Sequence, residues 1–145
     1  MKIIEPSTPD EYHQYYELRW RILRAPWKQP RGSEQDELEQ SSNHFMVIDS
    51  HPAVVGVGRL HFNSIREAQI RYMAIGIKQQ RKGIGTLLLQ ILEDKAVELG
   101  AASIVLDARE HALGFYRKRG YELEAPGHVL FNAIAHVRMR KYFVL

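Results

Sequence analysis

The stretch Lys78-Gln79-Gln80-Arg81-Lys82-Gly83-Ile84-Gly85-Thr86 joins an expected strand to the clearest amphipathic helix of the chain. From 83 to 99, apolar side chains recur at helical spacing, and Gly100 follows as the residue type that often ends a helix. The start of a helix leaves backbone N–H groups without partners and carries a partial positive charge. Two glycines at this start have no Cβ to hold an anion away from the backbone, and three basic side chains surround them. The stretch therefore predicts a site for a diphosphate or a phosphorylated cofactor.

Two familiar phosphate-binding patterns do not match this stretch. The P-loop pattern G-x-x-x-x-G-K-[ST] is absent from the sequence. The dinucleotide pattern G-x-G-x-x-G fails because Leu88 occupies its last position. From these residues alone, a glycine-containing loop with solvated charges remains an open alternative.

The flanking sequence predicts a single α/β (α+β) domain over residues 1–145. The expected strands cover 3–4, 45–48, 54–62, 69–77, 103–108, 121–124 and 135–143, and the expected helices cover 8–23, 83–99 and 111–119, with a short acidic helix or turn at 33–39. Thr8, Pro9 and Glu11 form a strong helix start, with a cap, a first-turn proline and a capping box. Hairpin strands followed by β-α-β predict a mixed, mostly antiparallel central sheet with helices on both faces.

Composition excludes several classes of protein. The chain has 45% hydrophobic and 26% charged residues, as ordinary globular domains do, and no cysteine for disulfides, thiolate zinc sites or thiol nucleophiles. Its net charge is only +3, and its basic runs lack interleaved aromatics, so we expect no nucleic-acid partner. No signal peptide and no apolar run of about 20 residues is visible, so we expect a cytoplasmic protein that does not enter a membrane.

Two sequence signatures resemble the GCN5-related N-acetyltransferase (GNAT) superfamily, in its small bacterial branches. Gln80-Arg81-Lys82-Gly83-Ile84-Gly85 is similar to the acetyl-CoA motif Gln/Arg-x-x-Gly-x-Gly/Ala. The segment from Ala112 to Tyr121 is similar to the family's A-x-x-F-Y-x-x-x-G-F/Y segment. Their order and separation make the pair more specific than either signature alone, and the resemblance covers the chain from about Val54 onward.

The resemblance implies acetyl-CoA as cosubstrate and a set of residues that contact it. In the family, the strand before the motif splays from its neighbour, and its free backbone groups hold the pantetheine arm and polarise the thioester carbonyl. The implied cofactor-binding residues are Met73, Ala74, Ile75, Gln80, Arg81, Lys82, Gly83, Ile84, Gly85, Thr86, Arg109, Phe115 and Tyr116. Tyr116 matches the family tyrosine that protonates the departing CoA thiolate, and a core tyrosine packed beside Phe115 is the structural alternative.

The general base is not identified by the motifs. The family often uses a glutamate on the cofactor strand or its neighbour, but the strand expected at 69–77 has no carboxylate. His61 and His136 are the candidates because histidine titrates near neutral pH, although a strand histidine is more often structural. Arg109 stands where many family members have a cofactor-contacting asparagine, so its contact with the cofactor is in question. No His, Asp and Glu set has metal-ligand spacing, so we expect no metal.

The acceptor amine is not specified by the sequence. Glu34, Asp36, Glu37 and Glu39 could attract an amine, but a solvated acidic face is the simpler interpretation. Trp20 and Trp27 flank this region and could line an acceptor pocket, with packing favoured for Trp20. The acceptor is expected to be a small-molecule or peptide amine, and the sequence leaves open whether the chain forms a homodimer.

We therefore expect an acetyl-CoA-dependent N-acetyltransferase that transfers the acetyl group directly to a primary amine in a ternary complex. Two rivals remain open: a non-catalytic CoA or acyl-CoA sensor or subunit, and a different phosphate-ligand protein such as a nucleotide binder. Tyr116 favours the enzyme, while the missing carboxylate leaves the sensor open.

Overall fold

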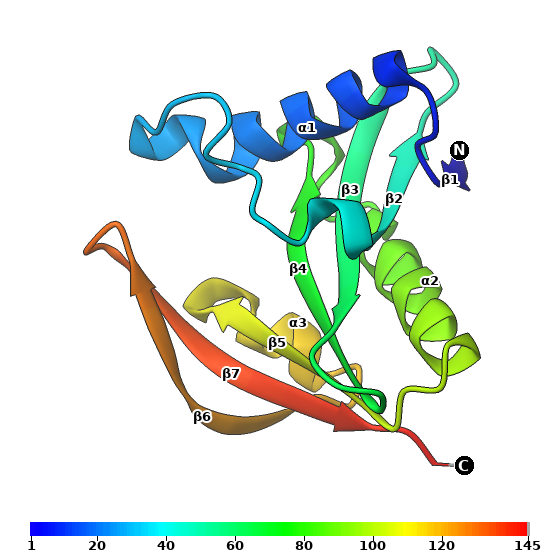
Figure 1. Ribbon diagram of the computed structural model, residues 1–145. Helices are drawn as coiled ribbons and strands as arrows, with labels where there is room; N and C mark the ends of the chain where they lie inside the picture. The colour runs from blue at the N-terminus through cyan, green and yellow to red at the C-terminus, as the bar shows by residue number, and fades with distance from the viewer. Residues whose placement is uncertain (145) are drawn as a thin grey trace.

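A single mixed sheet runs through the computed structural model, which describes residues 1–144 (Figure 1). Within that range, seven strands pair in the order β1-β2-β3-β4-β5-β7-β6. They are β1 Lys2–Ile4, β2 Asn43–Ile48, β3 Val54–Phe62, β4 Glu67–Ile75, β5 Ser103–Arg109, β6 Glu122–Leu130 and β7 Ile134–Tyr142. Of the pairings among these strands, β4 with β5 is parallel and the others are antiparallel. The expected α/β class with a mostly antiparallel sheet is confirmed, and Leu145, the end of the expected domain, lies outside the described residues.

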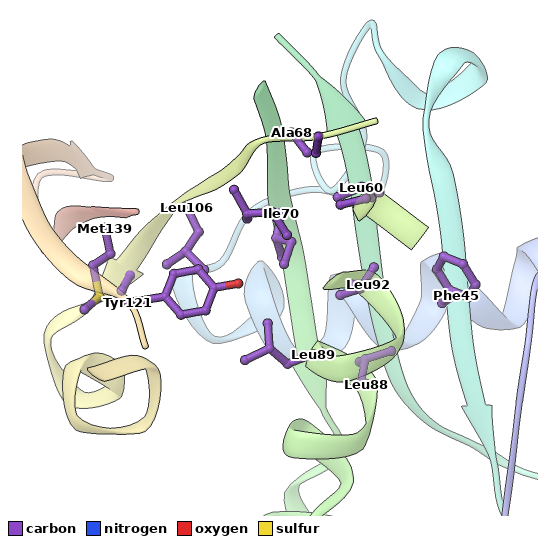
Figure 2. Packing of buried hydrophobic residues seen from close by; sticks show 14 of the residues in the cluster. Phe45, Leu60, Ala68, Ile70, Leu88, Leu89, Leu92, Leu106, Tyr121 and Met139 are labelled. Carbon is purple, nitrogen blue, oxygen red and sulfur yellow. The ribbon is translucent and has the colours of Figure 1, made fainter. Parts of the chain in front are cut away.

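Helices cover both faces of the sheet, as expected. Helix α1 (Pro9–Leu23) packs on one face, and α2 (Ile84–Glu98) with the short α3 (Leu113–Arg117) packs on the other. The predicted capping box of α1 is present, and the predicted glycine after α2, Gly100, has a φ of +97°. Figure 2 shows the leucines at 88, 89 and 92 of α2 packed toward the strands, because their spacing places them on one helix face.

A β-bulge interrupts β4 in the middle of the sheet. Register shifts between Val57 and Arg59 of β3, so that Gly58 lies opposite two residues of β4. One of these, Tyr72, has a φ of +57°. A Cβ on Gly58 would lie 2.9 Å from Leu92 Cδ1 of α2, so the glycine allows this leucine to pack directly against the strand. The bulge changes which side chains of β4 face α1 and which face α2.

Strands β4 and β5 diverge after a short parallel ladder. Pairing covers Glu67 with Ser103 through Gln69 with Val105 and then stops, although the strands continue to Ile75 and Arg109. Figure 1 shows the sheet opening between β4 and β5 beyond this point. The divergence expected for the strand that precedes the glycine motif is therefore present, and it leaves one edge of β4 without a ladder partner in the described structure.

The last hairpin is longer than the sequence predicted. We expected a strand at 121–124, but β6 extends from Glu122 to Leu130, through Pro126 and Gly127. The prediction was too short because proline usually stops a strand by removing an N–H donor. Here β6 is the edge strand of the sheet, where one row of donors faces solvent and a proline is tolerated.

The acidic segment at 33–39 is not the solvated face that we expected. It forms turns rather than a helix, and Asp36 and Glu39 pair with Arg59 at 2.5 and 2.7 Å. Glu39 also pairs with Arg19 at 2.9 Å. Arg19 and Arg59 are completely buried, and a buried guanidinium needs a counter-charge. The expectation was wrong because the sequence does not reveal that two arginines from α1 and β3 lie inside.

Candidate active site

A cleft of about 580 Å³ opens where β4 and β5 diverge. Its walls come from β4, the start of α2, the end of β5, α3, the end of α1 and the β6–β7 hairpin. Most of the predicted site residues therefore meet in one place, although they are spread over the second half of the sequence. The exceptions are His61, Lys82 and Ile84, which do not line the cleft.

One end of the cleft is formed by the N-terminus of α2. Gly83 is the residue that caps this helix, its φ is +82°, and no side chain caps the helix. The first-turn backbone N–H groups of α2 consequently have no intrahelical acceptor and are available to an anion. Gln80 holds the loop by donating from Nε2 to the carbonyl oxygen of Ile75 at 3.2 Å. This geometry fits the diphosphate that the sequence predicted.

The other residues of the motif divide between the cleft and the core. Gln80, Arg81, Gly83, Gly85 and Thr86 line the cleft. Ile84 points into the core with 2% exposure, and Lys82 is exposed to solvent. Any contact of these two residues with an anion would be through the backbone of Ile84 or a mobile Lys82 side chain.

The middle of the cleft is bounded by β4 and α3. Met73, Ala74 and Ile75 line it along the edge of β4 that has no ladder partner. Opposite them, Tyr116 donates from its phenol to the sulfur of Met73 at 3.9 Å. Its ring packs edge-on against Phe115 at 5.0 Å. Burial raises the pKa of Tyr116 to about 12, so the phenol stays protonated at neutral pH.

Arg119 connects α3 to the start of α2. It ends the basic run Arg117-Lys118-Arg119, which by sequence alone is interpreted as a solvated face, and for Arg119 that interpretation is wrong. Its guanidinium lies 3.9 Å from the centre of the Phe115 ring and donates to the carbonyl oxygen of Phe115 and to the hydroxyl of Thr86. These contacts hold a positive charge beside the uncapped helix start. Residue type and spacing alone gave no sign of them.

The far end of the cleft contains the candidate histidine of β7. His136 donates from Nδ1 to the carbonyl oxygen of His128 at 3.1 Å, which leaves Nε2 with the lone pair. The two imidazole rings stack with centroids 4.3 Å apart. Burial lowers the pKa of His136, and the nearby charge of Arg109 acts in the same direction. A neutral imidazole with one unshared nitrogen can accept a proton from an amine.

The other candidate, His61, lies outside the cleft and has both ring nitrogens engaged. Arg59 donates to its Nδ1 at 3.2 Å, and its Nε2 donates to Asn63 Oδ1 at 3.2 Å. Its exposure is 6%. His61 therefore has no free lone pair and no route to an amine in the cleft, and we carry only His136 forward as a base.

Arg109 lies at the end of β5, where it pairs in register with His136 and lines the cleft. Its guanidinium is half-buried and has no hydrogen-bond or ion-pair partner among residues 1–144. Burial lowers the pKa of Arg109, and the charge of Arg24 lowers it further. The arginine that replaces the family's asparagine thus faces the cleft, where a ligand can reach it.

Three residues at the far end of the cleft were not identified as site residues from the sequence. Arg24 comes from the end of α1, and His128 and Leu130 come from the β6–β7 hairpin. Asp107 pairs with Arg138 at 3.2 Å and lies 3.8 Å from His128, so its charge is largely compensated. No local motif marks these positions, because they meet only when α1 and the last hairpin close over the sheet. Trp20 and Trp27, which we considered for an acceptor pocket, do not line the cleft.

Neither a metal cluster nor a membrane-crossing helix is found in residues 1–144. No three His, Asp or Glu side chains in that range are grouped as metal ligands would be. Each helix in the same range is too short or too polar to cross a bilayer.

Comparison with known proteins agrees with this geometry. A family model described as an acetyltransferase (GNAT) domain matches residues 26–143. The uncharacterized N-acetyltransferase YjcF of Bacillus subtilis (strain 168) is 26% identical over 141 residues, covering 97% of this chain and 99% of the relative.

Solved structures agree in fold over nearly the whole chain. An aminoglycoside 6'-N-acetyltransferase complexed with coenzyme A superposes with a TM-score of 0.81 at 18% identity, covering 100% of this chain and 98% of that chain. An acyl-CoA N-acyltransferase from Pseudomonas aeruginosa gives a TM-score of 0.81 at 20% identity, covering 97% of both chains. At these identities the likeness concerns the fold.

Proposed function

The chain belongs to the acetyltransferase (GNAT) family, and from this premise we propose that it transfers an acetyl group from acetyl-CoA to a primary amine of a small molecule or peptide. We propose direct transfer, in which both substrates are bound at once and no residue of the chain is acetylated. The absence of cysteine from the sequence supports this, because no thiol is present to carry the group.

One observation carries the proposal. The unpaired edge of β4 runs from the uncapped start of α2 to Tyr116, along a single cleft. A diphosphate at one end and an extended amide-containing arm along the edge would match these backbone groups in order. CoA has those two parts in that order, and nucleotide binding through a P-loop would require a motif that the sequence lacks.

We assign the CoA contacts to the lining residues of this part of the cleft. The first-turn N–H groups of α2, together with Arg81 and Arg119, would bind the diphosphate. The edge at Met73, Ala74 and Ile75 would hold the pantetheine arm, and an N–H there would polarise the thioester carbonyl. Bound acetyl-CoA supplies the activated acetyl group.

Two side chains would carry out the proton transfers of the reaction, one as base and one as acid. His136 Nε2 accepts a proton from the attacking amine nitrogen as the new C–N bond forms. Tyr116 donates its phenol proton to the sulfur as the C–S bond breaks, and is reprotonated from solvent or from the released amine proton. A phenol with a pKa of about 12 is a weak acid. Tyr116 can therefore protonate the sulfur only as negative charge develops on it, and only while that sulfur is itself shielded from water.

The experiment that tests the proposal is a thermal-shift series with acetyl-CoA, CoA, ATP and NAD, followed by thiol-release assays with a panel of primary amines. We expect acetyl-CoA and CoA to raise Tm and ATP and NAD to leave it unchanged, because only ligands that bind the native state stabilise it. Stabilisation by ATP or NAD without stabilisation by CoA would exclude the assigned site. Binding of CoA without thiol release from any amine would favour a sensor or subunit over the enzyme.

A further inference from the structure

The end of the cleft away from the proposed CoA site is lined by more positively than negatively charged side chains. Of the described residues that line the whole cleft, five are arginines, at 24, 71, 81, 109 and 119, and one is an aspartate. Arg81 and Arg119 lie at the α2 end, next to the assigned diphosphate site. Arg24, Arg71 and Arg109 come from the end of α1, from β4 and from the end of β5, which surround the other end.

The other charged side chains near that end contact an opposite charge. Arg71 donates to Asp36 at 3.0 Å, although Asp36 is shared with Arg59, and Arg138 pairs with Asp107 at 3.2 Å. Arg24 and Arg109 differ from Arg71 because neither has a carboxylate contact in the described chain.

Arg24 is buried without a carboxylate partner in the described chain. Its exposure is 6%, and it donates from Nε to the carbonyl oxygen of Ser33 and from Nη1 to that of Leu23. These backbone acceptors are neutral, so the positive charge is not compensated. The ring centres of Tyr72 and Phe131 lie 5.6 and 5.4 Å from its guanidinium carbon, within the range of a cation–π interaction.

Arg109 adds a second guanidinium without a carboxylate partner, on the wall of the same cleft. It has no partner within residues 1–144, and the charge of Arg24 lowers its pKa, which means that the two groups repel each other. Two like charges held together under burial are unfavourable unless an anion joins them. The planar donor groups of arginine match the oxygens of a carboxylate or a phosphate.

We infer that the acceptor amine carries an oxyanion, a carboxylate or a phosphate, which binds between Arg24 and Arg109 while the amine points toward His136. The inference rests on the proposed acetyl transfer and names the substrate class of the same cleft. It excludes polycationic acceptors such as the aminoglycoside named for one structural neighbour, because two fixed guanidinium groups would repel them.

The test uses conjugates of CoA with the acceptor. In each conjugate, the methyl carbon of an acetyl unit is bonded to the CoA sulfur, and its carbonyl carbon is bonded to the amine nitrogen of the acceptor. Four acceptors are compared by calorimetry: glycine, glycinamide, phosphoethanolamine and spermidine. The glycine and glycinamide conjugates differ only in the carboxylate, so their ratio of Kd values measures the anion contact. The phosphoethanolamine conjugate separates a phosphate preference from a carboxylate preference.

We expect an anionic conjugate to bind about tenfold or more tightly than the glycinamide conjugate, since a hydrogen bond to a charged group is worth that much. Arg109→Gln and Arg24→Gln should remove this difference while leaving the Kd of CoA alone unchanged. Arg117→Gln and Arg21→Gln, which alter exposed arginines outside the cleft, should preserve it.

Other outcomes overturn the inference in distinguishable ways. Equal binding of the four conjugates, or tightest binding of the spermidine conjugate, would show that the acceptor end does not select an anion. A loss of CoA affinity in Arg109→Gln that is equal for all ligands would reassign this arginine to the cofactor. Failure of CoA and of every conjugate to bind would instead reject the proposed function. Thermal melting of each variant separates loss of binding from loss of folding.

Discussion

The phenol oxygen of Tyr116 lies 3.9 Å from the sulfur of Met73, so that side chains 43 residues apart in sequence meet inside the cleft. Met73 is one of the two residues of the bulge in β4, and Tyr116 belongs to the short helix after β5. The contact places the phenol beside the edge of β4 where the strand has lost its neighbour.

Replacement of Tyr116 by Phe removes the hydroxyl and keeps the ring that packs against Phe115. We expect kcat to fall by about 10²-fold or more, because general acid catalysis typically contributes that much. The Kd of CoA and the Tm should stay close to wild type. The measurement is steady-state thiol release beside calorimetric CoA binding, and an unchanged kcat would remove Tyr116 from the mechanism.

The pH dependence of the reaction should report His136. Burial lowers its pKa from 6.5, so the imidazole remains neutral, and able to accept a proton, to a pH below 6.5. We therefore expect kcat/KM to fall on the acid side with a midpoint below 6.5, as the ring becomes protonated. His136→Gln should lower the plateau and abolish this acid limb, whereas His61→Gln should leave the limb in place. An acid limb that persists in His136→Gln would point to another base.

Gly83 and Gly100 form a matched pair at the two ends of α2. Both have positive φ, at +82° and +97°, and a Cβ on either would meet no atom within 4 Å. Substitution by Ala should cost each about 1 kcal/mol of unfolding free energy, since the conformation disfavours a side chain. Only Gly83→Ala should also weaken CoA binding, because its Cβ would stand beside the uncapped N–H groups. Equal CoA affinity in the two variants would argue against the cradle.

Asp36 should govern acid stability. Burial alone would raise its pKa, but hydrogen bonds from Arg59 and from the backbone of Leu38 outweigh burial and lower it from 3.8 to about 2. Because the folded pKa lies below the unfolded value, the stabilisation is complete above pH 3.8 and is lost as the pH falls through about 2.

The substitution Asp36→Asn tests this contribution against a neighbour. We expect it to destabilise the fold by about 3 kcal/mol at neutral pH, because buried Arg59 loses a carboxylate. The variant should also lose less stability than wild type between pH 4 and 2. Exposed Glu37→Gln is the control and should change neither quantity. Urea melts at several pH values measure both effects, and identical curves for the two variants would contradict the assignment.

Local sequence determined most of the elements and the uncapped start of α2. The capping box fixed the start of α1, the apolar spacing fixed α2, and Gly83 and Gly85 marked an uncapped helix start. Each of these features depends on residues within one or two helical turns of each other. A short-range pattern can therefore be recognised without knowing the rest of the fold, and the predicted sheet class followed from the order of these elements.

Tertiary structure decided which residues share the cleft and which charges are compensated. The sequence could not distinguish His136 from His61, because the difference lies in the partners that each imidazole meets from other strands. It also assigned the acids near Asp36 to solvent, since the burial of Arg59 depends on the packing of α1 against the sheet. Arg24 and Arg109 are 85 positions apart in the printed sequence and become one charged site only when α1 and β5 meet. Charge and burial depend on three-dimensional neighbours, and those are set by the fold as a whole rather than by any segment.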